Sequence, residues 1–144
     1  MPKRGSVLAV CLSDRAGPKR PVPEVRLADG HGVEGDVHAG TARQVSLLCQ
    51  ASAEKIRQRG LAVGAGDFAE NILVDGLGPA DFPVGAEVCV GEAVLAVTQI
   101  GKECHSGCAI REQVGDCVMP REGIFARVVR GGVVRAGDPV VVNT

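Results

Sequence analysis

Aromatic residues are almost absent from this chain of 144 residues: they make up 2% of it, with three Phe and neither Trp nor Tyr. Proteins that bind single-stranded nucleic acids stack the bases on aromatic side chains. Phe68, Phe82 and Phe125 provide little material for such a platform, so this mode of binding is disfavoured. The same shortage means that the core has to be built from Val, Leu, Ile and Ala.

An excess of charge of one sign is lacking as well. The chain has 16 Lys and Arg against 17 Asp and Glu, a formal net charge of −1 and an isoelectric point near 6.3. Such a chain has no overall field to hold a polyanion, so we expect no nucleic-acid partner. The first 27 residues are locally basic, and we favour a solvated face there over a patch for a small anion. The basic residues of this stretch are Lys3, Arg4, Arg15, Lys19, Arg20 and Arg26.

Long apolar runs are missing too. No run approaches the roughly 18 residues of a membrane-spanning helix. The run Val7–Leu12 near the N-terminus is too short for the core of a signal peptide. We therefore expect a cytoplasmic protein with no membrane partner, in which the six cysteines are thiols rather than disulfides. The oligomeric state is left open.

Glycine and proline, with 20 and 8 residues, divide the chain into short apolar segments. Short β-branched runs between turn residues indicate strands. Strands are predicted at Val7–Leu12, Glu24–Ala28, Val45–Cys49, Ala86–Val90, Ala93–Thr98, Ala126–Val129, Val133–Arg135 and Pro139–Val142, a turn with a strand at Phe68–Val74, and a loop at Ala16–Pro23. Many short strands without βαβ alternation predict a mainly β barrel or sandwich, in a single domain over residues 1–144.

One helix is predicted over Gln50–Arg59, with Ser52 as its N-cap and Gly60 directly after its end. Two glycine-containing turns predict β-hairpins, one at Gly91-Glu92 and one at residues 130–132.

The six cysteines fall into two groups. One group lies inside apolar, strand-like runs and is predicted to be buried as small hydrophobic residues: Cys11, Cys49 and Cys89. The other lies in a segment rich in glycine and charge, which predicts a loop on a rigid scaffold: Cys104, Cys108 and Cys117. Cations flank this second group: Lys102, His105 and Arg111. Nearby cations stabilise a thiolate and lower the pKa of the thiol, so this segment is a candidate for nucleophilic sulfur chemistry.

Two other interpretations of the second group stay open. The spacing Cys-x3-Cys-x8-Cys, with His105 beside the first cysteine, allows a structural zinc site. It contains only one of the two close cysteine pairs that zinc knuckles use. The three residues are otherwise ordinary thiols.

A second polar cluster occupies residues 31–44. It contains His31, Glu34, Asp36, His38, Arg43 and Gln44. One interpretation is a metal site of histidines and carboxylates. The other is a glycine-rich turn in which Asp36 and His38 bond to the backbone and Arg43 pairs with a carboxylate. Arg43 and Arg121 are candidate planar forks for phosphate or carboxylate, and Glu70-Asn71 is either a turn or a further polar contact.

Several motifs follow one another over nearly the whole chain. They lie in Val33–Leu48 (VEGDVHAGTARQVSLL), Gly66–Leu77 (GDFAENILVDGL) and Val97–Val142, which includes the cysteine segment. Together they resemble the MOSC family, the domain found at the C-terminus of molybdenum cofactor sulfurases, in its short stand-alone bacterial type. The resemblance implies a mainly β, MOSC-like β-barrel of the pyruvate-kinase type with one or two short helices.

The resemblance also implies a sulfur carrier. In this role a PLP-dependent cysteine desulfurase loads sulfane sulfur onto a cysteine as a persulfide, which delivers the sulfur to a metal centre such as the molybdenum of the pterin cofactor or to a molybdoenzyme. Any PLP would belong to the partner enzyme, because the chain has no room for a PLP domain. The family cysteine matches Cys104 best, or Cys108 in a shifted alignment, and in relatives that hold the cofactor it is a molybdenum ligand.

Other residues take roles in this implied site. Lys102 and His105 would favour the thiolate, with His105 as proton shuttle, and Cys108 or Cys117 would release the sulfur by forming a disulfide. The implied contacts to the molybdenum cofactor are Asp36, His38, Arg43, Gln44, Asn71 and Arg121. The alternative is a module that binds the molybdenum cofactor, or a reductase of N-hydroxylated substrates, without sulfur transfer.

Overall fold

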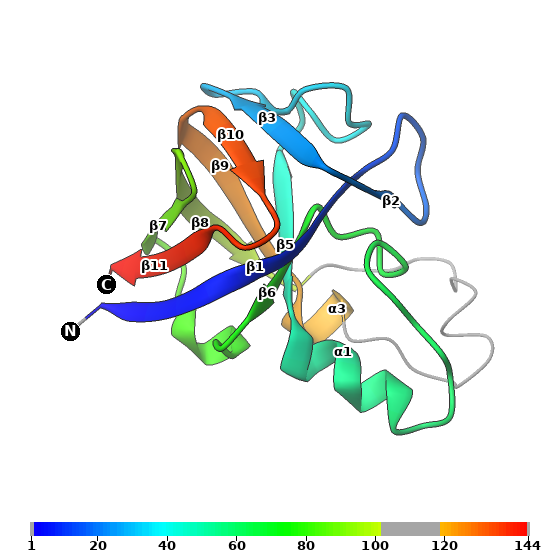
Figure 1. Ribbon diagram of the computed structural model, residues 1–144. Coiled ribbons are helices and arrows are strands. Elements are labelled where there is room, and N and C mark those ends of the chain that lie inside the picture. The colour runs from blue at the N-terminus through cyan, green and yellow to red at the C-terminus, as the bar shows by residue number, and fades with distance from the viewer. Residues whose placement is uncertain (1, 102–118, 144) are drawn as a thin grey trace.

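The structure is a computed structural model and describes residues 2–101 and 119–143. Seven strands of this part of the chain close into a barrel in the order β1-β11-β7-β8-β9-β5-β6, with β6 returning to β1 (Figure 1). Neighbouring strands are antiparallel except for β5 and β6, which are parallel and are connected through helix α1. The barrel strands are β1 (Lys3–Leu12), β5 (Val45–Cys49), β6 (Ile72–Asp75), β7 (Glu87–Val90), β8 (Ala93–Ile100), β9 (Ile124–Arg130) and β11 (Pro139–Asn143). The mainly β barrel that the sequence predicts is confirmed.

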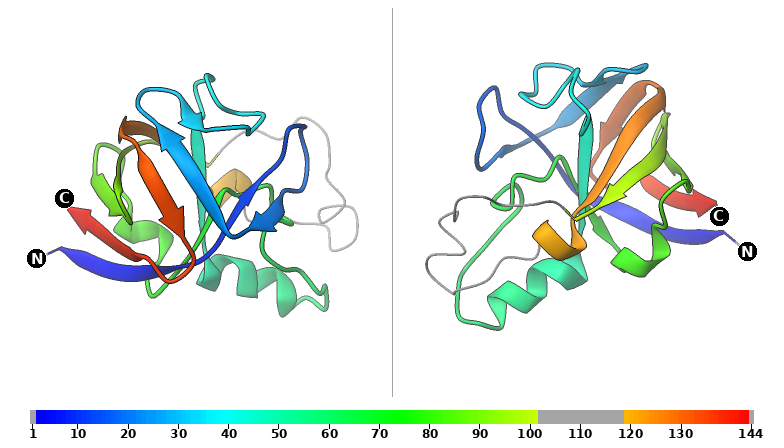
Figure 2. Two further views of the ribbon diagram at one scale, coloured as in Figure 1. Left: turned by 45° about the horizontal axis from the view of Figure 1, so that its top comes forward. Right: turned by 180° about the vertical axis from the view of Figure 1, so that it is seen from behind.

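A smaller sheet packs beside the barrel. It has the order β10-β3-β4, with β3 at Glu24–Ala28, β4 at Gly32–Val33 and β10 at Gly132–Arg135. Figures 1 and 2 show β3 and β10 beside β1 and β9, which they also contact. A short strand, β2 (Arg20–Val22), pairs with the end of β1. It lies within the segment that the three prolines predict to be a loop, so that prediction is wrong for these residues.

The core of the barrel is aliphatic, as the composition requires. Its residues are mainly Val, Leu and Ile, and Phe82 is the one aromatic residue of this cluster among the described residues. A second cluster lies between α1 (Gln50–Arg57) and the outside of the barrel, and it contains Ile56, Phe68 and Phe125. Figure 2 shows α1 and the short helix α3 (Met119–Glu122) close together at one end of the barrel. A 3-10 turn, η1, spans Pro79–Asp81.

Two local predictions fail for identifiable reasons. Cys49, not Ser52, precedes the first turn of α1, because strand β5 runs directly into the helix; Ser52 is buried instead. The hairpin predicted at residues 130–132 does not form, because β5 and β8 already occupy both edges of β9 and β10 pairs with β3. Gly131 permits this crossing, since a Cβ there would lie 2.2 Å from the backbone oxygen of Leu27. The hairpin at Gly91-Glu92 and the positive φ of Gly60 are confirmed.

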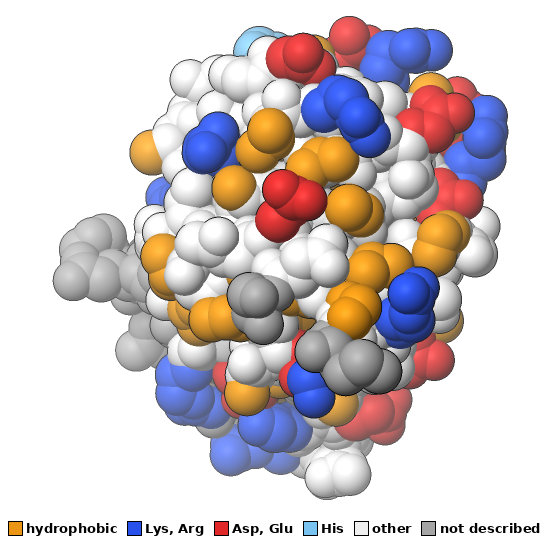
Figure 3. Space-filling view, turned by 90° about the vertical axis from the view of Figure 1, so that its left-hand side faces the viewer, with side chains coloured by type: hydrophobic (Ala, Val, Ile, Leu, Met, Phe, Trp, Pro, Cys, Tyr) orange, Lys and Arg blue, Asp and Glu red, His pale blue; other side chains and the backbone are white. Residues whose placement is uncertain are grey.

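The surface carries charges of both signs. On the face with β7, β11 and the two termini, hydrophobic side chains lie between basic and acidic ones (Figure 3). No helix of the described residues has the length and apolarity needed to cross a membrane.

Asn71 joins three barrel strands from inside the protein. Its Oδ1 accepts hydrogen bonds from the backbone N–H of Ser46 (3.0 Å) and from the Ser46 hydroxyl (3.2 Å). Its Nδ2 donates to the backbone oxygen of Cys11 (3.1 Å), at the far end of β1. Asn71 is fully buried, so these partners have no water to replace it.

We expect Asn71→Ala to lower the free energy of unfolding by about 2–4 kcal/mol, because it leaves a buried N–H and a buried C=O unpaired. Urea unfolding followed by circular dichroism measures the change. Asn143→Ala is the matched control: Asn143 is exposed at the end of β11, and its loss should change the stability by less than about 0.5 kcal/mol. Equal effects of the two substitutions would contradict the assignment.

Candidate functional site

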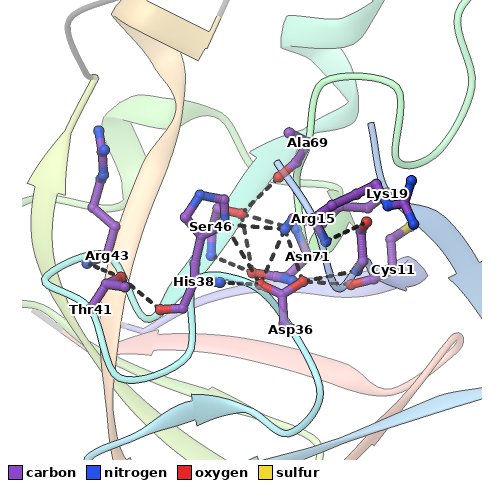
Figure 4. A network of polar contacts seen from close by, with 11 residues as sticks. Cys11, Arg15, Lys19, Asp36, His38, Thr41, Arg43, Ser46, Ala69 and Asn71 are labelled. Carbon is purple, nitrogen blue, oxygen red and sulfur yellow. Dashed lines mark hydrogen bonds and ion pairs between the residues drawn. The ribbon is translucent and has the colours of Figure 1, made fainter. Parts of the chain in front are cut away.

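Lys19, Asp36 and His38 form a buried cluster at one end of the barrel (Figure 4). Lys19 Nζ lies 2.9 Å from Oδ1 and 3.1 Å from Oδ2 of Asp36, and 3.2 Å from Nδ1 of His38. The side chains of Lys19 and Asp36 are completely buried, while that of His38 is 32% exposed. The cluster therefore has a buried ion pair on one side and an imidazole at the surface on the other.

Backbone contacts hold the cluster in place. Lys19 follows the loop after β1, and its N–H donates to the backbone oxygen of Gly66 (2.8 Å). A Cβ at Gly66 would lie 2.0 Å from the backbone oxygen of Lys19, and its φ is +87°, so glycine is required there. On the other side, Asp36 accepts from the backbone N–H groups of Ser13 (3.0 Å) and His38 (3.1 Å). The second contact is the Asx-type turn predicted for this loop.

The sequence analysis missed Lys19. Its prediction of a solvated basic face is confirmed for Lys3, Arg4, Arg15, Arg20 and Arg26, which are exposed, and is wrong for Lys19, which is 4% exposed. The signal that could have revealed Lys19 is its position between Pro18 and a predicted strand, opposite a glycine-rich loop with a carboxylate. Sequence separation of Lys19 and Asp36 hides that pairing.

The contacts of Asp36 determine its ionisation. Burial opposes the charged form, but hydrogen bonds from His38, Lys19 and Ser13 outweigh it and hold the pKa of Asp36 well below its usual range. Asp36 is therefore a carboxylate that compensates the buried ammonium group. Such a pair is costly to break, because either partner alone would be a buried, uncompensated charge.

Glu70 and Asn71 face inward. The carboxyl group of Glu70 is fully buried and accepts from the backbone N–H groups of Gly66 (2.9 Å) and Phe68 (3.2 Å). Burial raises the pKa of Glu70, and these two N–H groups offset only part of that effect. Of the two interpretations of Glu70-Asn71, Glu70 closes the turn at residues 66–70 and Asn71 joins the strands.

Gln44 also contacts the scaffold. Its Nε2 donates to the backbone oxygen of Gly30 (3.1 Å), and its Oε1 accepts from the N–H of Val128 in β9 (3.0 Å). It thus ties the loop before β5 to the barrel. His31 and Glu34 are exposed in the same loop. That Asp36, His38, Gln44 and Asn71 contact a cofactor stays a prediction.

Arg43 is half-buried, with the guanidinium carbon 5.7 Å from the centre of the Phe125 ring. This cation–π contact replaces the carboxylate partner that one interpretation of the loop assumed. Arg121 is exposed on α3. The two arginines lie on different elements, and their role as phosphate forks stays a prediction.

The described cysteines are poor nucleophiles or unremarkable. Cys11 and Cys49 are completely buried, as predicted, and burial raises the pKa of each thiol to about 12. Cys89 on β7 is half-buried. A thiol with so high a pKa is almost never a thiolate near neutral pH, so neither Cys11 nor Cys49 is suited to sulfur chemistry.

Five predicted catalytic residues lie outside the described residues: Lys102, Cys104, His105, Cys108 and Cys117. The possible molybdenum ligand Cys104 and the zinc alternative fall with them. Both flanks of this segment are described and firmly held. Gly101 donates to the backbone oxygen of Gly123 (2.7 Å), and Met119 is buried in the cluster beneath α1.

Glu122 fastens the second flank to α1. It accepts from the hydroxyl of Ser52 (2.7 Å) and from Nζ of Lys55 (2.7 Å). Burial opposes its charge, but these two contacts lower the pKa of Glu122 below its usual value. The buried Ser52 thus connects two elements instead of capping its own helix.

Within residues 2–101 and 119–143, no group of three or more His, Cys, Asp or Glu side chains could hold a metal ion. The interpretation of residues 31–44 as a metal site of histidines and carboxylates is therefore not supported. The arrangement provides a buried ion pair, a half-exposed imidazole and a half-buried arginine.

We expect Asp36→Asn to lower the free energy of unfolding at about pH 7 by about 3–5 kcal/mol, because it leaves the Lys19 ammonium group buried without a counter-charge. The pKa of Asp36 is lower in the folded chain than its ordinary 3.8, so its contribution is complete above that value and is lost as the pH falls below it. The difference from wild type should be constant above about pH 5 and shrink below about pH 4. Urea unfolding at several pH values measures it.

Glu34→Gln is the control for that experiment. Glu34 lies in the same loop, but its side chain is 54% exposed and 4.0 Å from Arg26. Its substitution should change the stability by less than about 0.5 kcal/mol at every pH. A loss as large as that of Asp36→Asn would contradict the importance of burial.

We expect iodoacetamide at about pH 8 to leave Cys11 and Cys49 unmodified in the folded protein, because both are buried and neither is a thiolate. Peptide mass spectrometry identifies the modified residues. In urea all six cysteines should react. Labelling of Cys11 or Cys49 in the folded protein at the rate found in urea would refute their assignment as inert.

Comparison with solved structures shows that the fold is shared. The YUAD protein from Bacillus subtilis is 17% identical with a TM-score of 0.81, and the match covers 99% of this chain and 97% of that one. YiiM from Escherichia coli is 22% identical with a TM-score of 0.71, covering 98% of this chain and 70% of that one. YiiM from Geobacillus stearothermophilus is 21% identical with a TM-score of 0.68, covering 97% and 73%.

No curated protein matches the chain. The family model described as the MOSC domain matches residues 34–141, which is well over half of the chain. This match includes the loop of Asp36 and His38, helix α1, the cysteine segment and most of the barrel. The chain belongs to the MOSC domain family, which is associated with functions related to the molybdenum cofactor.

Proposed function

We propose that this MOSC protein is a sulfur carrier for molybdenum-cofactor chemistry. It accepts sulfane sulfur on Cys104 from a PLP-dependent cysteine desulfurase and delivers it to a metal–sulfur centre, such as the molybdenum of the pterin cofactor or a molybdoenzyme. The observation that carries the proposal is the division of the thiols within a MOSC chain. Burial keeps Cys11 and Cys49 from reacting, which leaves the cation-flanked segment as the source of a nucleophilic thiol.

The loading step is a thiol–disulfide type exchange that needs no external oxidant or reductant. The Cys104 thiolate attacks the terminal sulfur of the desulfurase persulfide, a new S–S bond forms, and the old S–S bond breaks. The desulfurase cysteine leaves as a thiolate, so one persulfide is lost and one is gained. Lys102 and His105 favour the attacking thiolate, and His105 carries the proton.

Delivery repeats the exchange with a different leaving group. A second thiol, Cys108 or Cys117, attacks the inner sulfur of the Cys104 persulfide and forms a disulfide with it. The terminal sulfur leaves as hydrosulfide for the metal centre. A cellular thiol reductant then restores the two thiols.

The scaffold supports such a segment at both ends. Gly101 is bonded to Gly123, and Glu122 is bonded to Ser52 and Lys55 of α1. Reactive groups need a fixed frame, and loops between rigid elements commonly provide it. The proposed nucleophile thus lies between two anchored residues of the barrel.

The described residues fit a molybdenum cofactor in one respect. Arg43 provides a half-buried guanidinium group that could hold the phosphate, with Arg121 as a second candidate fork. Since the described part of the chain holds no cluster for a bare metal ion, the cofactor would have to bring most of the metal's ligands itself. When bound, it supplies the metal that receives sulfur.

The test is persulfide formation. Purified protein is incubated with a cysteine desulfurase and cysteine, and persulfides are trapped by alkylation and located by mass spectrometry. We expect loading on Cys104 that is lost in Cys104→Ser and retained in Cys89→Ser, the control on β7. Unchanged loading of Cys104→Ser, or no loading of the wild type, would defeat the proposal.

The same preparations test the alternative. A module that only binds the molybdenum cofactor should retain the cofactor after replacement of all three segment cysteines by serine. A reductase of N-hydroxylated substrates should consume such a substrate when the protein is produced with full cofactor supply. Either result without persulfide loading would replace the sulfur carrier as the function.

A further inference from the structure

The three hydrogens of the Lys19 ammonium group have three acceptors. Two are the oxygens of Asp36, at 2.9 and 3.1 Å, and the third is Nδ1 of His38, at 3.2 Å. Lysine ammonium can only donate, so Nδ1 has to accept in this contact. In a neutral imidazole one nitrogen accepts and the other carries the hydrogen, which places the hydrogen of His38 on Nε2.

A competing contact would give the opposite tautomer. If Nδ1 carried the hydrogen, it would donate to Oδ2 of Asp36, which lies 3.6 Å away. That distance is beyond a normal N–H···O hydrogen bond, whereas 3.2 Å to Lys19 is within the range. The opposite tautomer would also leave one buried Lys19 hydrogen facing an N–H. The shorter contact therefore decides the tautomer.

The exposed part of His38 is the other edge of the ring. Nδ1 faces Lys19 and Asp36, whose side chains are completely buried, so the 32% of the His38 side chain that is exposed lies away from them. Nε2 has no hydrogen-bond partner in residues 2–101 and 119–143. The backbone of His38 is also fixed, because its N–H donates to Asp36 and its carbonyl accepts from Thr41 Oγ1 (2.6 Å).

The charges around His38 favour an anion. Asp36 is compensated by Lys19, and Glu34 faces Arg26. Arg43, in the same loop and with its N–H bonded to Thr41 Oγ1, has no carboxylate partner in the described part of the chain. The loop thus presents a neutral N–H donor and a cation, and its acidic groups are occupied.

We propose that Lys19 is a positioning residue: it holds His38 with its hydrogen on Nε2 and so makes the exposed edge of the ring a fixed hydrogen-bond donor for an anionic oxygen ligand. Asp36 keeps Lys19 charged and oriented, and Lys19 in turn orients the imidazole. The tautomer does not depend on the proposed sulfur transfer. The ligand role assigns the same end of the barrel to anion recognition.

The tautomer is measured by long-range ¹H–¹⁵N spectra of protein labelled at its three histidines, with His38→Gln identifying the signal of His38. In the wild type we expect the neutral form with hydrogen on Nε2. Lys19→Met should convert it to a mixture of tautomers. Lys55→Met, which removes an exposed lysine bonded to Glu122, should leave it unchanged.

The ligand role is tested with inorganic phosphate as the probe, at constant ionic strength, by the shift of the same Nε2 signal. We expect saturable binding that is weakened about tenfold in His38→Gln, the equivalent of one lost hydrogen bond. Lys19→Met should weaken it similarly, but only when His38 is present. No saturable shift would overturn the ligand role.

A wild-type His38 with its hydrogen on Nδ1 would overturn the proposal without any variant, so the test does not depend on how Lys19→Met folds. A tautomer unaffected by a folded Lys19→Met would overturn it as well. Neither result bears on persulfide loading. Conversely, absence of loading would overturn the proposed function and leave the tautomer intact.

Discussion

Closure of the barrel depends on β1, the strand that is shared by the most partners. Its first half pairs with β11 near the C-terminus, its second half pairs with β2, and its other edge pairs with β6. One strand therefore joins the two ends of the chain and seals a core made of Val, Leu and Ile. Because small aliphatic side chains pack well in many arrangements, such a core alone specifies its geometry weakly. The specification has to come from polar contacts.

Those polar contacts gather where β1 ends and β6 begins. Asn71 bonds to Ser46 and Cys11, and Glu70 closes the turn that receives the backbone of Lys19. Lys19 in turn compensates Asp36. Each of these groups is buried, so each has to find its partner for the barrel to close. The same contacts that fix the fold also fix the position of His38.

Much of the fold could be predicted from the sequence, because strand patterns and the helix are local signals. The range Glu24–Ala28 and the turn at Gly91-Glu92 follow from alternation and turn chemistry alone. The partner of β10 could not, since it depends on β9 having no free edge. Lys19 was missed for a similar reason: a lysine among prolines is usually solvated, and only the folded chain brings Asp36 to it.

The candidate site divides along the same line. Residue type and spacing identified Cys104 and its neighbours as chemistry and Cys11 and Cys49 as core, and burial of the latter two bears out that half of the division. The loop of Asp36 and His38 was recognised as polar, but its roles rest on distances that spacing does not contain. A difference of 0.4 Å, between 3.2 Å to Lys19 and 3.6 Å to Asp36, decides which nitrogen of His38 carries the hydrogen. An aliphatic barrel can hold such a difference because every buried polar group around it is already bonded, so the imidazole has one arrangement that leaves no donor facing another donor.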